Sequence, residues 1–137
     1  MIRKVQVIIY TQVPDLSVLL LRRPPERGHI WQPVTGNLES TDRSLLDAAL
    51  REMFEETGIN ETTRIITTNL EFHFKKEGKE VFEQVVGMEV DGKVAVRLSP
   101  EHIEYTWVQE SEALDLLHWD INKEGVRQVL NTACNTK

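Results

Sequence analysis

The 137-residue sequence predicts an α+β fold, in which helices pack on the faces of a mixed β-sheet. Runs rich in β-branched and aliphatic residues precede and follow one long segment of strong helix formers, and two helical segments close the chain. Hydrophobic residues make up 40% and charged residues 28%, which is typical of a globular protein. No repeat or linker-like tract interrupts the sequence, so we expect a single domain over residues 1–137.

The first part of the chain predicts a β-hairpin. Residues 5–11 and 17–22 are rich in residues that favour strands, and a Pro-Asp turn at 14–15 separates them. A loop rich in proline leads to a short extended segment at 31–35, which Gly36 closes. We expect these strands to be neighbours in the sheet.

A helix is expected over Arg43–Thr57, with Gly58 at its C-terminal end and Asp42 or Ser40 as the N-cap. Its apolar positions recur at helical spacing and are expected to pack on the sheet: Leu46, Leu50, Met53 and Thr57. Two small residues in its middle, Ala48 and Ala49, are expected to leave space for a ligand beside the opposite face.

The second half of the chain predicts further strands and two short helices. The strand segments are Arg64–Lys75, Val81–Val90, Lys93–Leu98 and Ile103–Val108, and the helices are Ser111–Leu117 and Asn122–Thr132. Asp91 and Gly92 predict a tight turn between the second and third of these strands.

Charge and cysteine content exclude several classes of protein. The 22 acidic residues outnumber the 16 Lys and Arg, which argues against binding to nucleic acid or to an anionic membrane. A small anionic substrate stays possible because a bound divalent cation inverts the local charge. The single cysteine, Cys134, excludes a disulfide framework and indicates a cytoplasmic location, and the longest apolar run, Val18–Leu21, is too short to span a bilayer.

Three carboxylates lie on one face of the predicted helix. Glu52, Glu55 and Glu56 are at i, i+3 and i+4, in the last turn, where mutual repulsion and the helix dipole both disfavour negative charge. Only Arg51, which can reach Glu55, compensates locally. Such a cluster suits a hard divalent cation such as Mg²⁺, which also bridges phosphate oxygens, and the alternative is a solvated acidic face.

Gly36 together with the run from Arg51 to Ile59 resembles the signature box of the Nudix hydrolases. The second half of the box matches at every defining position. In the first half, the acidic position of the family falls on Arg43, and an insertion of one residue would let Asp42 take that role. In the family this acidic residue forms a salt bridge with the arginine of the box, and the irregular spacing leaves two alternatives here: Asp42 forms it, or no residue does.

The resemblance covers nearly the whole chain and implies the Nudix α/β/α sandwich. It includes the Arg22-Arg23 pair, the stretch Trp31–Gly36 and a downstream Glu101-His102 pair. Within the family, Trp31–Gly36 is most similar to the branch that hydrolyses dATP and dihydroneopterin triphosphate. The implied substrate is thus a small nucleoside polyphosphate, which attacking water cleaves at phosphorus.

The family likeness also implies roles for individual residues. Glu52, Glu55, Glu56 and the carbonyl of Gly36 would hold one to three Mg²⁺ or Mn²⁺ ions, and Arg51 would orient the carboxylates. Glu101 is expected to be a fourth ligand or the general base.

Other residues keep two interpretations each. Glu104 is the alternative candidate for the role of fourth ligand or general base. The alternative interpretation of Glu101 is an N-cap or a surface acid. We expect Arg23 to bind a phosphate and Trp31 to stack on a base or pterin, the alternatives being a solvated loop residue and a loop anchor. His73 and His102 are expected to be surface or core residues.

Three other functions remain open at this stage. A dinucleoside polyphosphate of the Ap4A type is an alternative substrate for the same chemistry. A second alternative function is that of a nucleotide-binding Nudix module with little catalytic activity, although such a module would not need three metal-binding carboxylates. An acidic interaction domain would not bind Mg²⁺.

Overall fold

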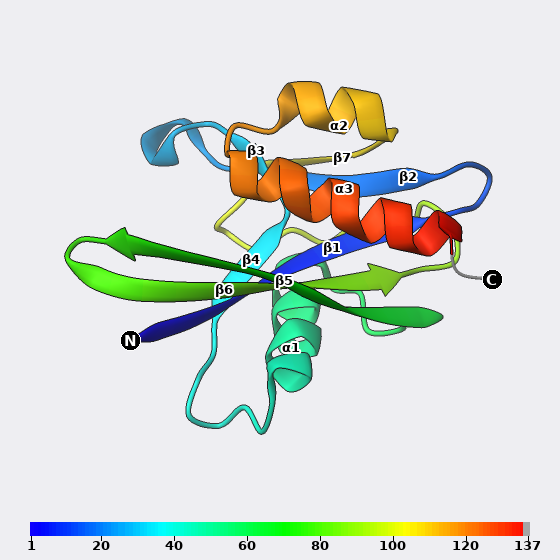
Figure 1. Ribbon diagram of the computed structural model, residues 1–137. Helices are drawn as coiled ribbons and strands as arrows, with labels where there is room; N and C mark the ends of the chain where they lie inside the picture. Colours follow the sequence, from blue (N-terminus) through cyan, green and yellow to red (C-terminus); the bar gives the residue numbers. More distant parts are fainter. Residues whose placement is uncertain (136–137) are drawn as a thin grey trace.

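The computed structural model describes residues 1–135, and in this part of the chain three α-helices and a seven-stranded sheet form the fold (Figure 1). The strands are β1 (Ile2–Thr11), β2 (Ser17–Arg22), β3 (Trp31–Gln32), β4 (Val34–Asn37), β5 (Arg64–Lys76), β6 (Lys79–Glu89) and β7 (Glu104–Val108). The helices are α1 (Leu45–Thr57), α2 (Glu110–Leu116) and α3 (Asp120–Asn135), with a short 3₁₀ turn η1 at Pro25–Arg27.

Strand β1 organises a mixed sheet. It runs parallel to β6 along most of its length and antiparallel to two other strands on its opposite edge. There its C-terminal end pairs with β2 and its N-terminal half with β4, so the sheet divides on that side. Pro33, which has no N–H to donate, lies where the chain crosses from β3 on one branch to β4 on the other.

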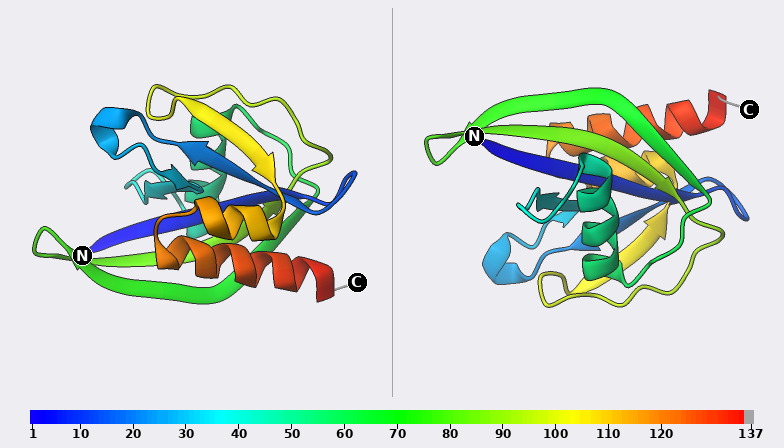
Figure 2. Two further views of the ribbon diagram at one scale, coloured as in Figure 1. Left: turned by 90° about the horizontal axis from the view of Figure 1, so that it is seen from above. Right: turned by 90° about the horizontal axis from the view of Figure 1, so that it is seen from below.

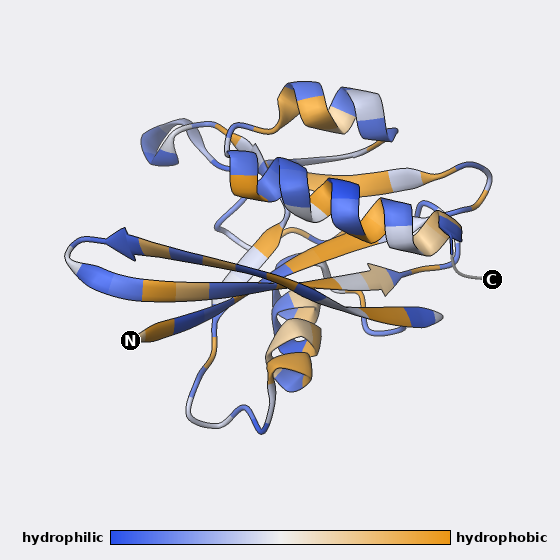
Figure 3. Ribbon diagram, in the orientation of Figure 1, coloured by the Kyte–Doolittle hydropathy of each residue, from blue (hydrophilic) through white to orange (hydrophobic). Residues whose placement is uncertain are grey.

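Helices cover both faces of the sheet. Helix α1 lies on one face, and α2 and α3 lie on the other (Figure 2). Side chains of β1 alternate between two apolar clusters, with Val5, Val7 and Ile9 on the α1 side and Ile8 and Tyr10 on the α3 side. The middle of β1 is buried on both faces, and residues 7–9 are accordingly all apolar; in Figure 3 this part of the strand is orange, whereas the strand is partly blue near the N-terminus. The predicted α+β class and the three-layer arrangement are confirmed.

One predicted strand is absent from the described residues. Residues 93–98 are irregular and pair with no strand. Their side chains do alternate, with Val94, Val96 and Leu98 against the α1-side cluster, which explains the strand-like sequence pattern. The segment nevertheless lies across the C-terminal end of α1, where the N–H of Arg97 donates to the carbonyl of Thr57. The predicted strand Lys93–Leu98 is therefore wrong, because its alternation reflects packing against α1 and not pairing in the sheet.

Helix α1 begins later than the sequence predicted, and its packing face is the predicted one only in part: Met53 and Thr57 are buried and Leu50 packs against the α1-side cluster, as expected. Ser44 is the N-cap and accepts a hydrogen bond from the N–H of Asp47, so neither Asp42 nor Ser40 caps the helix. Leu46 is exposed, whereas Ala48 and Ala49 are completely buried in the α1-side cluster. The small alanines thus bring the helix close to the sheet and do not leave space for a ligand. This close approach also buries Glu52 and Glu56 beside the sheet.

Cys134 is exposed near the end of α3. No helix among residues 1–135 is both long and apolar enough to cross a membrane.

Candidate functional site

The first half of the site joins α1 to strand β4. Gly36 pairs with Val5 of β1, and a Cβ built on Gly36 would overlap the carboxyl carbon and both carboxyl oxygens of Glu52. Only glycine therefore lets this carboxylate lie against the strand. Glu52 is 9% exposed, and burial raises its pKa while Arg51 opposes that rise.

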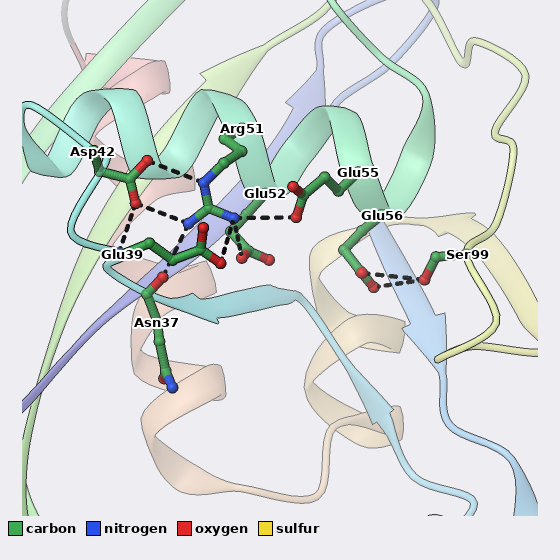
Figure 4. Close-up of polar contacts among 8 residues, drawn as sticks. All are labelled: Asn37, Glu39, Asp42, Arg51, Glu52, Glu55, Glu56 and Ser99. Carbon is green, nitrogen blue, oxygen red and sulfur yellow. Dashed lines mark hydrogen bonds and ion pairs between the residues drawn. The ribbon is translucent and has the colours of Figure 1, made fainter.

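Arg51 connects four carboxylates around the start and end of α1 (Figure 4). Its Nε and Nη2 donate to the two oxygens of Asp42 at 3.0 and 2.9 Å, a bidentate geometry, and Nη2 also donates to the carbonyl of Asn37 at 3.0 Å. Its Nη1 donates to Glu52 and Glu55 at 2.9 and 3.1 Å.

These contacts show which acidic residue pairs with the arginine of the signature box. Asp42 forms the salt bridge with the box arginine, and its hydrogen bond with Arg51 lowers the pKa of Asp42 below its ordinary value. The predicted contact between Arg51 and Glu55 is present as well, whereas Glu39, 3.5 Å from Arg51, was missed by the sequence analysis.

The second half of the site surrounds Glu56, a residue that is 4% exposed. The hydroxyl of Ser99 lies 3.1 Å from each of its oxygens, and Nδ1 of His102 lies 3.0 Å from Oε2. Burial acts to raise the pKa of Glu56, but contacts with His102, Glu101 and Ser99 outweigh burial and lower it. Ser99 and His102 were not expected here, and the only sequence signal was that His102 directly follows Glu101.

The structure separates the two candidates for a fourth carboxylate. Glu101 lies beside Glu56, and this contact, with burial, raises the pKa of Glu101. Glu104 instead lies on β7, 3.5 Å from Nη1 of Arg22. Glu101 is also not a helix cap, because Gln109 precedes α2. Of the two, only Glu101 joins the carboxylates of α1.

The predicted substrate-binding residues have different surroundings. The guanidinium of Arg22 lies 5.4 Å from the centre of the Trp31 ring, and Arg22 also donates to the carbonyl of His29 at 3.1 Å. Trp31 is half-buried against the α3-side cluster, so its contacts are those of a loop anchor, and stacking on a substrate stays a prediction.

Arg23 shares its region with a lysine that the sequence analysis missed. Burial lowers the pKa of Lys4; attraction to Glu83 opposes this shift, and repulsion from Lys76 and Arg23 adds to it. Glu52 also acts on Lys4. The cationic side chains of Arg23 and Lys4 thus lie within electrostatic range of one another. Lys4 also lies within electrostatic range of the Glu52 carboxylate.

The donor set fits a hard divalent cation. It consists of carboxylate oxygens and a backbone carbonyl, which are the ligands that Mg²⁺ and Mn²⁺ accept in proteins. Buried carboxylates are costly without a compensating cation, and Arg51 reaches Glu52 but not the pair of Glu56 and Glu101. Among residues 1–135 no three acidic, His or Cys side chains already converge on one point, since Arg51 lies between Glu52 and Glu55.

A three-layer fold with a carboxylate-bearing helix against a glycine strand is the architecture that the box resemblance implied. The model of the NUDIX domain family matches residues 2–129. The chain therefore belongs to the Nudix family, which confirms the family predicted from the sequence.

Relatives of assigned function are similar over most of this chain. A bis(5'-nucleosyl)-tetraphosphatase of Rattus norvegicus is 30% identical, covering 85% of this chain and 81% of that protein. The solved structure of the E. coli dihydroneopterin triphosphate pyrophosphohydrolase superposes with a TM-score of 0.81 at 25% identity, covering 94% of this chain and 95% of that one. An octanoyltransferase of Myxococcus xanthus is 36% identical over 84% of this chain, which spans only 32% of that longer protein.

Proposed function

We propose that this protein is a divalent-cation-dependent pyrophosphohydrolase that cleaves a phosphoric anhydride bond in a nucleoside triphosphate or a similar compound. The observation that carries the proposal is the pair of buried carboxylates, Glu52 and Glu56, that α1 presents between the Gly36 strand and the Glu101 segment. The likeness to the E. coli dihydroneopterin triphosphate enzyme supports a substrate of the dNTP or dihydroneopterin triphosphate type.

Mg²⁺ or Mn²⁺ would be held by Glu52, Glu55, Glu56 and the carbonyl of Gly36. Such an ion, when bound, offsets the charge of the phosphates and lowers the pKa of bound water. Arg51 orients Glu52 and Glu55 through one guanidinium nitrogen, while its other two nitrogens are fixed by Asp42. One to three ions are compatible with this number of donors.

The chain's own residues would position the substrate and move the proton. Arg23, assisted by Lys4, would bind the phosphate chain, because phosphoryl transfer depends mainly on positioning and charge neutralisation. Glu101, whose pKa is raised by its contact with Glu56, suits a general base that takes the proton of the attacking water. No covalent intermediate with the protein is needed.

An asymmetrical dinucleoside tetraphosphate is the second candidate substrate. It is favoured by the 30% identity with the rat tetraphosphatase. The two candidates differ in their products, because a nucleoside triphosphate yields a monophosphate and pyrophosphate, whereas Ap4A yields AMP and ATP when cleaved asymmetrically.

Hydrolysis of a panel of both substrate types, with product identification, tests the proposal. We expect turnover that requires Mg²⁺ or Mn²⁺, that EDTA abolishes and that Glu56→Gln reduces by orders of magnitude. Glu124→Gln is the matched control, because Glu124 is exposed and pairs with Arg127 on α3, on the opposite face of the sheet from α1. No turnover of any phosphoric anhydride, or full activity of Glu56→Gln, would refute the proposal and favour a binding module.

A further inference from the structure

His102 is a buried polar residue to which the proposed reaction assigns no part. Its side chain is 4% exposed, and it follows Glu101 in the segment that lies beside the end of α1. A buried imidazole is costly unless its nitrogens have polar partners. Its surroundings therefore indicate what it does.

Both ring nitrogens of His102 face a polar group. Nε2 lies 2.9 Å from the amide nitrogen of Gln32 on β3, and Nδ1 lies 3.0 Å from Oε2 of Glu56 on α1. An amide nitrogen can only donate, so Nε2 must be the acceptor, and the proton of the neutral ring is then on Nδ1. Gln32 thus selects the tautomer whose proton is on Nδ1, the nitrogen beside Glu56; Nδ1 and the carboxylate are close but lack the alignment of a hydrogen bond, so their attraction is electrostatic.

The segment of residues 99–102 contacts Glu56 through two side chains, those of Ser99 and His102. The Ser99 hydroxyl lies 3.1 Å from both carboxylate oxygens, and the backbone N–H of Glu101 donates to that hydroxyl at 3.3 Å. The backbone N–H of His102 donates to the carbonyl of Ser99 at 3.2 Å, which closes the turn. The same short turn therefore carries the two partners of Glu56 and the neighbouring carboxyl group of Glu101.

We propose that His102, with its tautomer set by Gln32, is a positioning residue that fixes the Glu56 carboxylate beside Glu101. This role rests on the proposed function, because it matters only if Glu56 binds the cation. Residues that orient a ligating carboxylate typically change metal affinity or activity by about 10- to 100-fold when they are replaced. The effect should appear in metal affinity and kcat, and KM should change little, because His102 does not reach the substrate.

Three variants separate positioning from packing. His102→Leu keeps an apolar volume but removes both polar contacts. His102→Asn keeps an amide nitrogen near the place of Nδ1 and loses the contact with Gln32. Gln32→Leu leaves the imidazole but removes its tautomer selection. His73→Leu is the matched control, because His73 is an exposed histidine that contacts Glu71 at 2.7 Å.

Mn²⁺ affinity is measured by calorimetry without substrate, beside kcat, KM and thermal unfolding in EDTA. We expect His102→Leu to weaken Mn²⁺ binding about 10- to 100-fold and to lower kcat, with KM within about twofold. His102→Asn should recover most of the affinity, Gln32→Leu should lose severalfold, and His73→Leu should match the wild type.

Wild-type Mn²⁺ affinity in His102→Leu, or equal defects in the Asn and Leu variants, would overturn the positioning role while leaving the hydrolase proposal intact. If the wild-type protein neither binds Mn²⁺ nor hydrolyses any substrate, both proposals fail. If the Leu variant does not fold, Gln32→Leu still decides the question, because unchanged affinity there contradicts the role of the Gln32–His102 contact.

Discussion

Replacing Gly36 by alanine tests whether the contact between β4 and α1 builds the site. The added Cβ would overlap the carboxyl group of Glu52. Helix α1 cannot retreat, because Ala49 and Met53 anchor it in the core with 0% and 1% of their surface exposed. The carboxylate must therefore move.

The size of that movement gives the expected loss. Nonbonded carbon atoms pack at about 3.5 Å, so the overlap exceeds roughly 1 Å and the Glu52 carboxylate must shift by at least that much. A misplacement of about 1 Å can cost about 100-fold in rate, equivalent to about 2.7 kcal/mol of transition-state stabilisation. The free energy of unfolding should change by less than about 1 kcal/mol, because the obstacle is the end of a side chain and not the backbone.

Gly87→Ala is the matched control for this experiment. Its Cβ would lie 2.6 Å from Cγ1 of Val129 and 3.2 Å from Cβ of Ile66, in the core and remote from the carboxylates. Overpacking there should destabilise the fold by about 1–3 kcal/mol in urea unfolding, with Mn²⁺ affinity unchanged. The assays are kcat/KM, Mn²⁺ calorimetry and urea unfolding. A Gly36→Ala protein with wild-type kcat/KM and Mn²⁺ affinity would refute the reasoning.

Four further predictions concern the same site. Asp42→Asn should reduce kcat/KM by about tenfold, because Arg51 loses its bidentate partner, and equal kcat/KM in variant and wild type would contradict this. Arg51 lowers the pKa of Asp42 in the folded protein, so the pair stabilises the fold fully above about pH 3.9 and loses this effect as the pH falls further. The fall of Tm with decreasing pH below about 3.9 should therefore be shallower in Asp42→Asn than in the wild type. Adding Mn²⁺ at about 100 times its Kd should raise the free energy of unfolding by about 2.7 kcal/mol and EDTA should reverse this, whereas a Tm that does not respond to Mn²⁺ would argue against a site in the folded state. Glu101→Gln should lower kcat strongly and Glu104→Gln only slightly, and the reverse order in steady-state kinetics would exchange the roles of the two residues.

Local features of the fold and site were predictable from the sequence. Gly58 has a positive φ of 75°, and its N–H donates to the carbonyl of Phe54, as expected of a glycine that ends a helix. The spacing of the three carboxylates and the contact of Arg51 with Glu55 also follow from helical geometry alone. Such features need only residues within a few positions of one another.

Predictions failed where a pattern had more than one structural explanation. Residues 93–98 alternate like a strand, but they pack against α1 without an edge to pair with. The apolar spacing of α1 correctly indicated Met53 and Thr57 as buried, but it also indicated Leu46, which is exposed, and it missed the buried alanines and glutamates. Periodicity shows which residues share a face, and it does not show which face a neighbouring element will cover.

The sequence by itself determined the family, the α+β class and the group of carboxylates on one helix, because each depends on a short, ordered run of residues. Only the tertiary structure decided how those carboxylates are held. Ser99 contacts Glu56 across 43 positions of sequence, and Gln32 contacts His102 across 70. No spacing rule relates residues so far apart; they meet because the division of the sheet at β1 brings β3 and the segment before β7 to the end of α1, where buried polar groups must find partners.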